Sequence, residues 1–133
     1  MNNNRPLSPH LSIYKKVLPA VFSILHRFTG IGLSFCSVII VLWICLIALG
    51  ENYFYLFKQV SENLMFKIIF IIWTIGLFYH LFNGIRYLYW SFGIGMDLKK
   101  VYISGYVVIL LTLASSVLVW FIWWVIIDLN GSF

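Results

Sequence analysis

Uncharged, mostly apolar residues form three long runs in this chain, and charged segments separate them. The runs cover residues 28–50, 68–85 and 101–127, with 23, 18 and 27 residues. A membrane-spanning helix needs roughly 20 apolar residues, whereas a transmembrane strand would show ~10-residue segments of alternating polarity, and none occur in this sequence. The pattern predicts an all-α membrane protein with three transmembrane helices. Their expected bounds are about 19–50, 64–92 and 101–127.

Turn-forming residues indicate where these helices begin and end. Residues 1–18 are expected to form an extended leader, because two prolines disfavour a helix there. Pro19 suits the first turn of a helix, where its missing N–H costs nothing. Gly93 and Gly95 are expected to break the second helix. The mixed-charge segment 51–67 is predicted to be a loop whose aromatic residues lie at the membrane interface.

Composition and charge place the chain in a bilayer and orient it. Hydrophobic residues make up 62% and charged residues 10%, against about 25% charged residues in a soluble domain. Seven of the nine cations flank the start of the first helix or follow the second, so the N-terminus is predicted on the cytoplasmic or matrix side. This bias explains the net charge of +5 without a nucleic acid partner. The seven are Arg5, Lys15, Lys16, Arg27, Arg86, Lys99 and Lys100.

His80 is the candidate for chemistry within the second run. An imidazole at membrane depth costs free energy unless it is used, so it marks a functional site by default. Gly76 and Gly84 lie one helical turn before and after His80 on the same face. They leave room for a broad, flat group, and a porphyrin approaching its axial ligand fits that description. Asn83 and Tyr87 lie close to the same face.

The first helix carries a stripe of small and polar residues. Its members are spaced 4, 3, 4 and 3 residues apart: Ser23, Arg27, Gly30, Ser34 and Ser37. The inner half of this stripe is typical of a packing seam between membrane helices. The outer half carries a hydroxyl and a guanidinium, with His26 on an adjoining turn. Arg27 alone could be an anchor that reaches the interface, but an anchor needs neither Ser23 nor His26 beside it.

The third helix shows a packing face and no sign of ion transport. Gly105, Thr112 and Ser116 are expected to face other helices, and three tryptophans near its end suit a membrane interface. No Asp, Glu, Lys or Arg lies deep in any of the three runs. A small transporter would need a deep carboxylate or a broken helix, and neither is seen.

Two passages together resemble one family. The first runs from Arg5 to Tyr14 (RPLSPHLSIY) and continues in SILHRFTG, from Ser23 to Gly30; the second is His80-x-x-x-Gly-Ile-Arg-x-Leu-x-Trp90. They resemble the cytochrome b large membrane-anchor subunit of succinate dehydrogenase, respiratory complex II. The resemblance covers essentially the whole chain, and the three-helix layout agrees with it.

The resemblance implies roles for individual residues. His80 would be an axial ligand of the iron of haem b, with Gly76 and Gly84 giving clearance. Ser23 and Arg27 would line the ubiquinone site. His26 and Arg27 would also lie near the haem propionates, and Arg86 near the polar edge of the same region. These residue types suit the chemistry, because a hydroxyl and a cation can stabilise the charge that develops on a quinone during reduction.

The resemblance also implies partners and a location. His26 and His10 lie at or beyond the membrane surface, so a second haem ligand would come from another, smaller anchor subunit. An iron–sulfur subunit would deliver electrons from a flavoprotein subunit of this enzyme of the tricarboxylic acid cycle. The chain would be a multi-pass protein of the mitochondrial inner membrane, possibly organelle-encoded, or of a bacterial cytoplasmic membrane.

Three positions depart from the family pattern, and two alternative functions stay open. Tyr87 stands where His or Phe is usual, Ser91 where Asp is usual and Lys16 where Pro is common. The second departure removes a carboxylate that could have paired with Arg86. A haem-free structural anchor or assembly subunit is one alternative. The anchor of a quinol:fumarate reductase, which runs the reaction in reverse, is the other.

Overall fold

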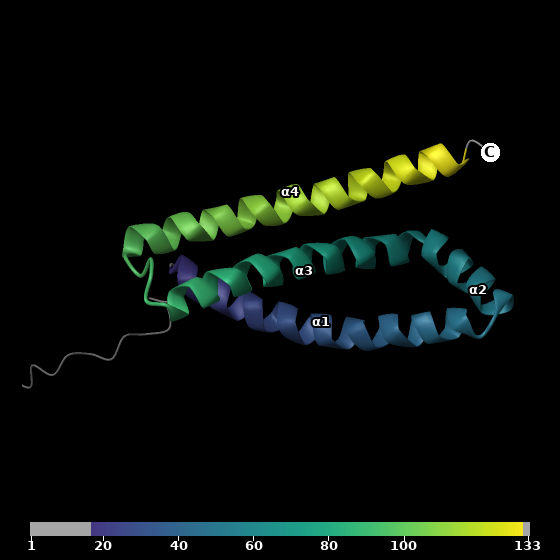
Figure 1. Ribbon diagram of the computed structural model, residues 1–133, viewed down its shortest axis with the longest axis horizontal. Coiled ribbons are helices and arrows are strands. Elements are labelled where there is room, and N and C mark those ends of the chain that lie inside the picture. The colour runs from purple at the N-terminus through teal and green to yellow at the C-terminus, as the bar shows by residue number, and fades with distance from the viewer. Residues whose placement is uncertain (1–16, 132–133) are drawn as a thin grey trace, which may run out of the picture.

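Three long helices and one short helix make up the described part of the chain, residues 17–131, with side chains described to residue 126. In this computed structural model α1 spans Leu18–Ala48, α2 Glu51–Glu62, α3 Leu64–Ser91 and α4 Leu98–Gly131 (Figure 1). Each long helix is long and apolar enough to cross a membrane. The predicted all-α architecture with three spans is confirmed. The extended leader predicted over residues 1–18 lies, apart from its last two residues, outside the described chain and stays a prediction.

Helix α3 lies between the other two long helices. The long helices alternate in direction, so the start of α1, the end of α3 and the start of α4 meet at one end of the bundle (Figure 1). Helix α3 packs extensively against both α1 and α4, whereas α1 and α4 touch each other over a smaller area. Residues from all three helices therefore meet at this shared end.

Local sequence signals explain the ends of the helices. Pro19 lies in the first turn of α1, as predicted. The Asn63 side chain accepts a hydrogen bond of 2.9 Å from the Met65 N–H and caps the start of α3. Between α3 and α4, Gly93 and Gly95 have φ of 74° and 80°, a left-handed conformation that glycine adopts without strain. The predicted break after the second span is confirmed.

The segment between the first two spans differs from the prediction. Instead of a loop over residues 51–67, the structure has helix α2 and then the first turn of α3. Tyr53, Phe57 and Val60 recur at helical spacing, so α2 presents an apolar side, and Phe57 packs edge-on against Trp43 of α1 at 4.5 Å. Phe57 therefore holds α2 against α1, whereas Tyr53, Phe54 and Tyr55 are exposed, and their place at the membrane interface stays a prediction.

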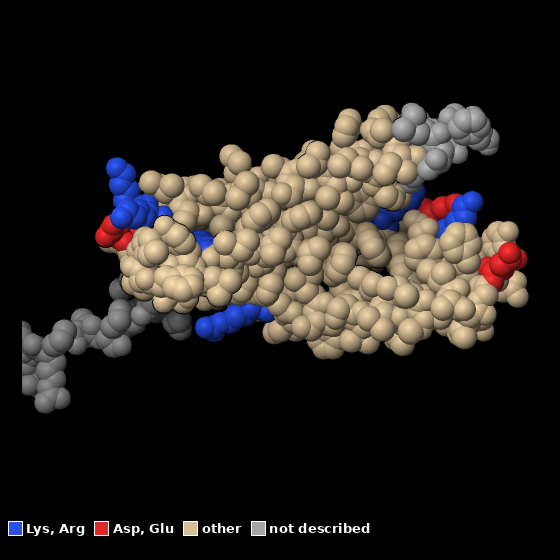
Figure 2. All heavy atoms as spheres, in the orientation of Figure 1, with Lys and Arg blue, Asp and Glu red and all other residues tan. Residues whose placement is uncertain are grey.

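Burial in this bundle is reversed relative to a soluble protein. Large apolar side chains lie on the outside, such as Phe35 and Phe92, which are 71% and 76% exposed. The buried residues are few and include many polar ones: Phe22, Thr74, Tyr79, Asn83, Arg86, Val108, Thr112 and Ser116. Figure 2 shows charged side chains toward the ends of the helices and uncharged surface between them. This arrangement suits lipid as the solvent, where polar and close-packed contacts hold helices together.

Candidate functional site

His80 of α3 is held by the backbone and side chains of α1. Its Nδ1 lies 3.2 Å from the His26 carbonyl oxygen and 3.2 Å from Thr29 Oγ1. The Thr29 hydroxyl lies within 3.0 Å of two carbonyl oxygens of its own helix, those of Leu25 and His26, and can donate its single proton to one of them. A carbonyl oxygen only accepts, so Nδ1 donates. The proton is thereby fixed on Nδ1, and Nε2 keeps its lone pair.

Nε2 of His80 is the free atom of this ring. It makes no hydrogen bond within residues 17–126, and it is not among the buried polar atoms without a partner. An imidazole whose Nδ1–H donates to a carbonyl and whose Nε2 is open has the arrangement of a metal-ligating histidine. The described residues contain no group of three metal-ligating side chains. Among these residues His80 is therefore a single candidate ligand and not part of a cluster of protein ligands.

Three glycines lie where α1 packs against the His80 face of α3, and the approach is closest at Gly30. A Cβ on Gly30 would lie 3.0 Å from His80 Cε1, closer than nine in ten real contacts of this kind. The glycines predicted to give clearance have looser neighbours: a Cβ on Gly76 would lie 3.9 Å from Thr29, and one on Gly84 3.8 Å from His26. Within this chain, part of the space predicted beside His80 is therefore taken by α1. A flat ligand would bind at the open edge of the α1–α3 pair.

His26 stacks on His80. The two rings are parallel within 7° with centroids 4.0 Å apart, and the Tyr87 ring meets His26 edge-on at 5.1 Å. His26 Nδ1 is buried and has no hydrogen-bond partner within residues 17–126. An unpartnered buried nitrogen costs free energy. This atom can be satisfied by a polar group from outside the chain.

Ser23 and Arg27 lie one turn apart near the start of α1. Ser23 is half-buried and Arg27 is exposed, and neither side chain makes a hydrogen bond within the described residues. The inner part of the predicted stripe differs from the prediction. Ser34 and Ser37 are exposed and bond to carbonyl oxygens of their own helix at 2.9 and 2.8 Å, so only Gly30 packs against α3.

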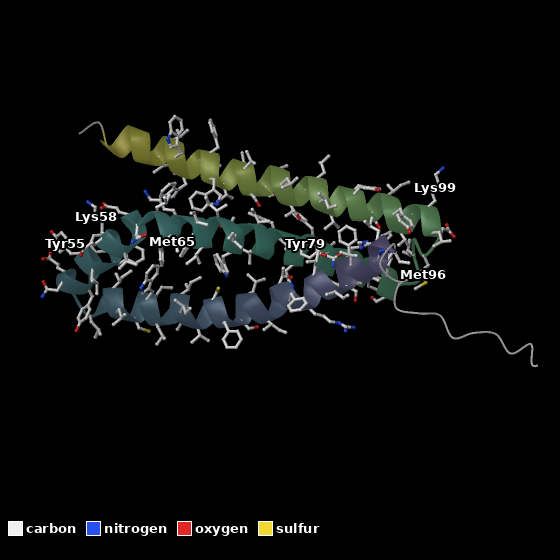
Figure 3. All side chains as sticks on the ribbon, turned by 180° about the vertical axis from the view of Figure 1, so that it is seen from behind. Tyr55, Lys58, Met65, Tyr79, Met96 and Lys99 are labelled. Carbon is white, nitrogen blue, oxygen red and sulfur yellow. The ribbon has the colours of Figure 1, made fainter. Side chains whose placement is uncertain are left out.

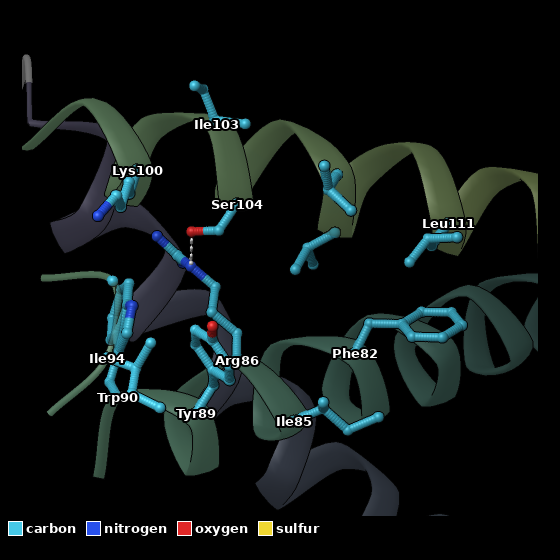
Figure 4. A pocket seen from close by; sticks show the side chains of 13 residues that line it. Phe82, Ile85, Arg86, Tyr89, Trp90, Ile94, Lys100, Ile103, Ser104 and Leu111 are labelled. Atoms are coloured by element: carbon cyan, nitrogen blue, oxygen red, sulfur yellow. Dashed lines mark hydrogen bonds between the residues drawn. The ribbon is translucent and has the colours of Figure 1, made fainter. Parts of the chain in front are cut away.

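Arg86 lies on the α4 side of α3, away from His80. Its Nε donates to Ser104 Oγ at 2.9 Å (Figure 4). Its Nη1 donates to Asn83 Oδ1 at 3.2 Å and its Nη2 to the Val101 carbonyl at 2.8 Å. Its guanidinium also lies over the Trp90 ring, 4.1 Å from the centroid. The sequence predicts Arg86 at the same surface as Arg27, but Arg86 is only 6% exposed. Its position near the haem edge stays a prediction.

Comparison with known proteins identifies the family. The family described as the succinate dehydrogenase/fumarate reductase transmembrane subunit matches residues 1–128. The chain belongs to this family. It is 39% identical to the succinate dehydrogenase cytochrome b556 subunit of Rickettsia bellii over 118 residues, covering 89% of this chain and 92% of the relative. It is 40% identical to the human mitochondrial cytochrome b560 subunit, with 87% of this chain and 70% of the relative covered.

A third relative, the cytochrome b560 subunit of Reclinomonas americana, is 37% identical over 128 residues, with 92% of this chain and 88% of the relative covered. The family resemblance predicted from the two motifs is confirmed. With its three apolar helices, this member of the family is a multi-pass protein of a bacterial or mitochondrial inner membrane.

Two residues of the site were missed by the sequence reasoning. The sequence pattern does not mark Thr29 and places Gly30 only in a packing stripe, yet both contact the His80 ring. Their helical spacing gave a signal, since Thr29 and Gly30 lie three and four residues after His26. The sequence alone does not reveal which residues of α1 lie level with His80, because that depends on the length of the α2 connection.

Proposed function

We propose that this succinate dehydrogenase cytochrome b subunit supplies one axial ligand of haem b, His80, and part of a ubiquinone-reduction site, Ser23 and Arg27. The observation that carries the ligand assignment is the fixed tautomer of His80. Two acceptors from α1 hold its Nδ1–H, and Nε2 is left with a lone pair and no partner in the described chain. Haem b would supply a one-electron carrier at this position.

The second axial ligand would come from outside this chain. His26 is the other histidine in the described residues, and its ring is stacked parallel on His80 at 4.0 Å. Two rings in that arrangement do not face each other across a metal. A second, smaller anchor subunit would provide the missing ligand and cover the open edge of the α1–α3 pair. Iron–sulfur and flavoprotein subunits would complete the enzyme, and the succinate chemistry would lie in them.

His26, Arg27 and Arg86 would interact with the haem propionates. His26 has a buried nitrogen without a partner, which a carboxylate oxygen would satisfy. Arg27 is exposed and free to reach a carboxylate, and its charge would stabilise one. Arg86 already donates three hydrogen bonds, to Asn83, Val101 and Ser104, so only its two remaining N–H groups could bind a carboxylate. Of the three, His26 has the strongest structural support.

Ser23 and Arg27 would bind the quinone carbonyl oxygens. Both lie near the start of α1, and in the described chain both have donors without a hydrogen-bond acceptor. Donors already in position when negative charge develops on a quinone oxygen lower the barrier to reduction. The electrons would arrive from the iron–sulfur subunit.

Substitution of His80 tests the ligand assignment. In the purified complex, His80→Ala should abolish or strongly alter the b-type band in the reduced-minus-oxidised spectrum, whereas Tyr79→Phe, on the neighbouring position, should keep it. An unchanged band in His80→Ala would show that the haem ligand is elsewhere. A wild-type complex without any b-type band would instead favour a haem-free structural anchor.

The quinone site has a separate test. Ser23→Ala and Arg27→Ala should each slow quinone reduction by about tenfold or more, the effect of losing one charge-assisted or transition-state hydrogen bond. Succinate oxidation by an artificial dye should be unaffected, because it bypasses the membrane subunits. Equal loss of both activities would indicate failed assembly and would contradict the role in quinone binding.

A further inference from the structure

Arg86 is a buried cation without an acidic partner in residues 17–126. It is 6% exposed, and its three hydrogen bonds go to neutral groups on Asn83, Val101 and Ser104. A guanidinium carries five N–H groups, so two donors remain. The one ion pair within the described residues joins Asp97 to Lys100 at 2.8 Å. Buried charges are normally paired, and stacking on aromatic rings compensates only partly. Within the described residues, no anion offsets the Arg86 charge.

A cavity of about 500 Å³ lies beside this guanidinium, between α3 and α4 (Figure 4). At its polar end are Arg86, Lys100 and Ser104, and no acidic side chain lines it. Its other end is apolar, with Phe82 and Leu111 among the lining residues. From Lys100 to Leu111 the α4 axis rises by roughly 16 Å. This length is close to the ~15 Å of hydrocarbon in one leaflet of a bilayer.

We propose that the cleft between α3 and α4 binds one anionic phospholipid. Its phosphate would accept hydrogen bonds from Arg86 and attract Lys100, and one acyl chain would lie along Phe82, Val107 and Leu111. Guanidinium groups bind phosphate oxygens strongly. Basic pockets between transmembrane helices, at the end of the bundle where positive charge collects, suit anionic lipid headgroups. A quinone is neutral and would leave the Arg86 charge uncompensated.

This lipid site lies on the α4 side of α3 and shares only Arg86 with the candidate haem and quinone residues. Arg86 follows His80 by six residues, which places it about 120° around α3. Its hydrogen-bond acceptors on other helices are on α4, whereas those of His80 are on α1. The Phe22 ring of α1 also lies 5.1 Å from the Arg86 guanidinium. The proposal therefore does not depend on the assignment of His80, Ser23 or Arg27.

Lipid titration of the purified, assembled complex tests this proposal. The complex is exchanged into phosphatidylcholine, phosphatidylglycerol is added, and bound lipid is counted by native mass spectrometry. Lys100→Gln should raise the half-saturating phosphatidylglycerol concentration about tenfold, equivalent to ~1.4 kcal/mol. The matched control is Lys99→Gln, which removes the same charge from the neighbouring residue, one that does not line the cavity. Asp97→Asn, which frees Lys100 from its ion pair, should strengthen binding.

Blocking the apolar end gives a second, independent measurement. Val107→Trp fills the groove and should abolish retention of one phosphatidylglycerol, whereas Leu110→Trp, at an exposed position of α4 outside the cavity, should not. Equal effects of Lys99→Gln and Lys100→Gln would show general surface attraction and would overturn the proposal. The proposal would also fail if phosphatidylcholine were retained equally or if millimolar inorganic phosphate displaced the lipid. Full retention of phosphatidylglycerol by Val107→Trp would contradict it as well. If Val107→Trp fails to assemble, the comparison of Lys100→Gln with Lys99→Gln still tests the proposal.

Discussion

His80 shows how one side chain can be held in position by a neighbouring helix. Its Nδ1 reaches a carbonyl oxygen and a hydroxyl of α1, and its Cε1 would lie only 3.0 Å from a Cβ on Gly30. The carbonyl sets the tautomer, the hydroxyl adds a second acceptor and the glycine allows the approach. Thr29 is in this way a positioning residue for the proposed haem ligand.

Thr29 gives a prediction at this scale, which rests on the haem assignment. Thr29→Val keeps the shape and removes the hydroxyl, so the Nδ1–H loses one acceptor and the imidazole becomes a weaker donor to ferric iron. The haem midpoint potential should rise by up to about 40 mV, the equivalent of ~1 kcal/mol for one electron. Redox titration of the b-type band measures the shift.

The control for this experiment is Thr29→Ser, which keeps the hydroxyl and should leave the potential close to that of the wild type. If Val and Ser shift the potential equally, the effect comes from packing, and the hydrogen bond has no role. If His80→Ala retains the band, the haem assignment itself fails, so the two failures are distinguishable.

At the scale of elements, the three long helices meet around Phe22. This α1 side chain is 4% exposed; its ring stacks with Tyr79 of α3, and its carbonyl accepts the Tyr79 hydroxyl at 2.8 Å. On the α4 side, a Cβ on Gly105 would lie only 2.8 Å from Phe22 Cε2. Buried Thr112 and Ser116 continue the same face of α4, as their spacing predicts. Small residues on α4 thus allow the close approach of a large aromatic ring.

Gly105→Ala should therefore loosen the contact of α4 with α1. The added methyl group forces the Phe22 ring to move, and overpacking of this kind typically costs 1–3 kcal/mol. The thermal midpoint of the purified complex should fall. Gly32→Ala is the matched control, because nothing lies within 4 Å of a Cβ there and alanine favours a helix. A stability loss that is equal in both variants would contradict the role of the Phe22 contact.

The sequence predicts the elements better than it predicts their contacts. Three spans follow from the apolar runs, and the break at Gly93 and Gly95 follows from residue type. The loop predicted over residues 51–67 is wrong, because the helical spacing of the aromatic residues in α2 is a better guide there than its mixed charge. The sequence also does not predict the hydrogen-bond partners of Arg86. Ser104 and Val101 belong to α4, and the sequence does not specify which side of α3 that helix packs against.

At the scale of the whole molecule, the charge distribution predicts how the chain crosses the membrane. Lys58 and Lys99 lie at opposite ends of the bundle (Figure 3). Positive residues collect at the end of Lys99, which is predicted to face the cytoplasm or matrix. The same end brings together Arg27, Arg86 and Lys100. The proposed quinone and phospholipid sites would then both open toward that side.

Labelling at Lys58 and Lys99 tests this orientation. With Cys36 and Cys45 replaced by Ala, Lys58→Cys should react with a membrane-impermeant maleimide added to intact cells or to mitochondria with a permeabilised outer membrane. Lys99→Cys should react only after the inner membrane is opened. The reverse pattern would contradict the predicted orientation, and equal labelling at both positions would show a mixed topology.

Helix α3 also bears on how the protein enters the bilayer during synthesis. Its most apolar window has a mean hydropathy of 1.9, against 2.7 for α1 and 2.3 for α4, and Asn83 and Arg86 add further polar groups near its end. His80 and Asn83 bond to carbonyl oxygens of α1, and Arg86 bonds to α4. Helix α3 is therefore the least stable of the three in lipid while it is alone. A translocon releasing helices one at a time would retain α3 until α4 emerges. Truncation before α4 should therefore yield a chain that membrane quality-control proteases remove.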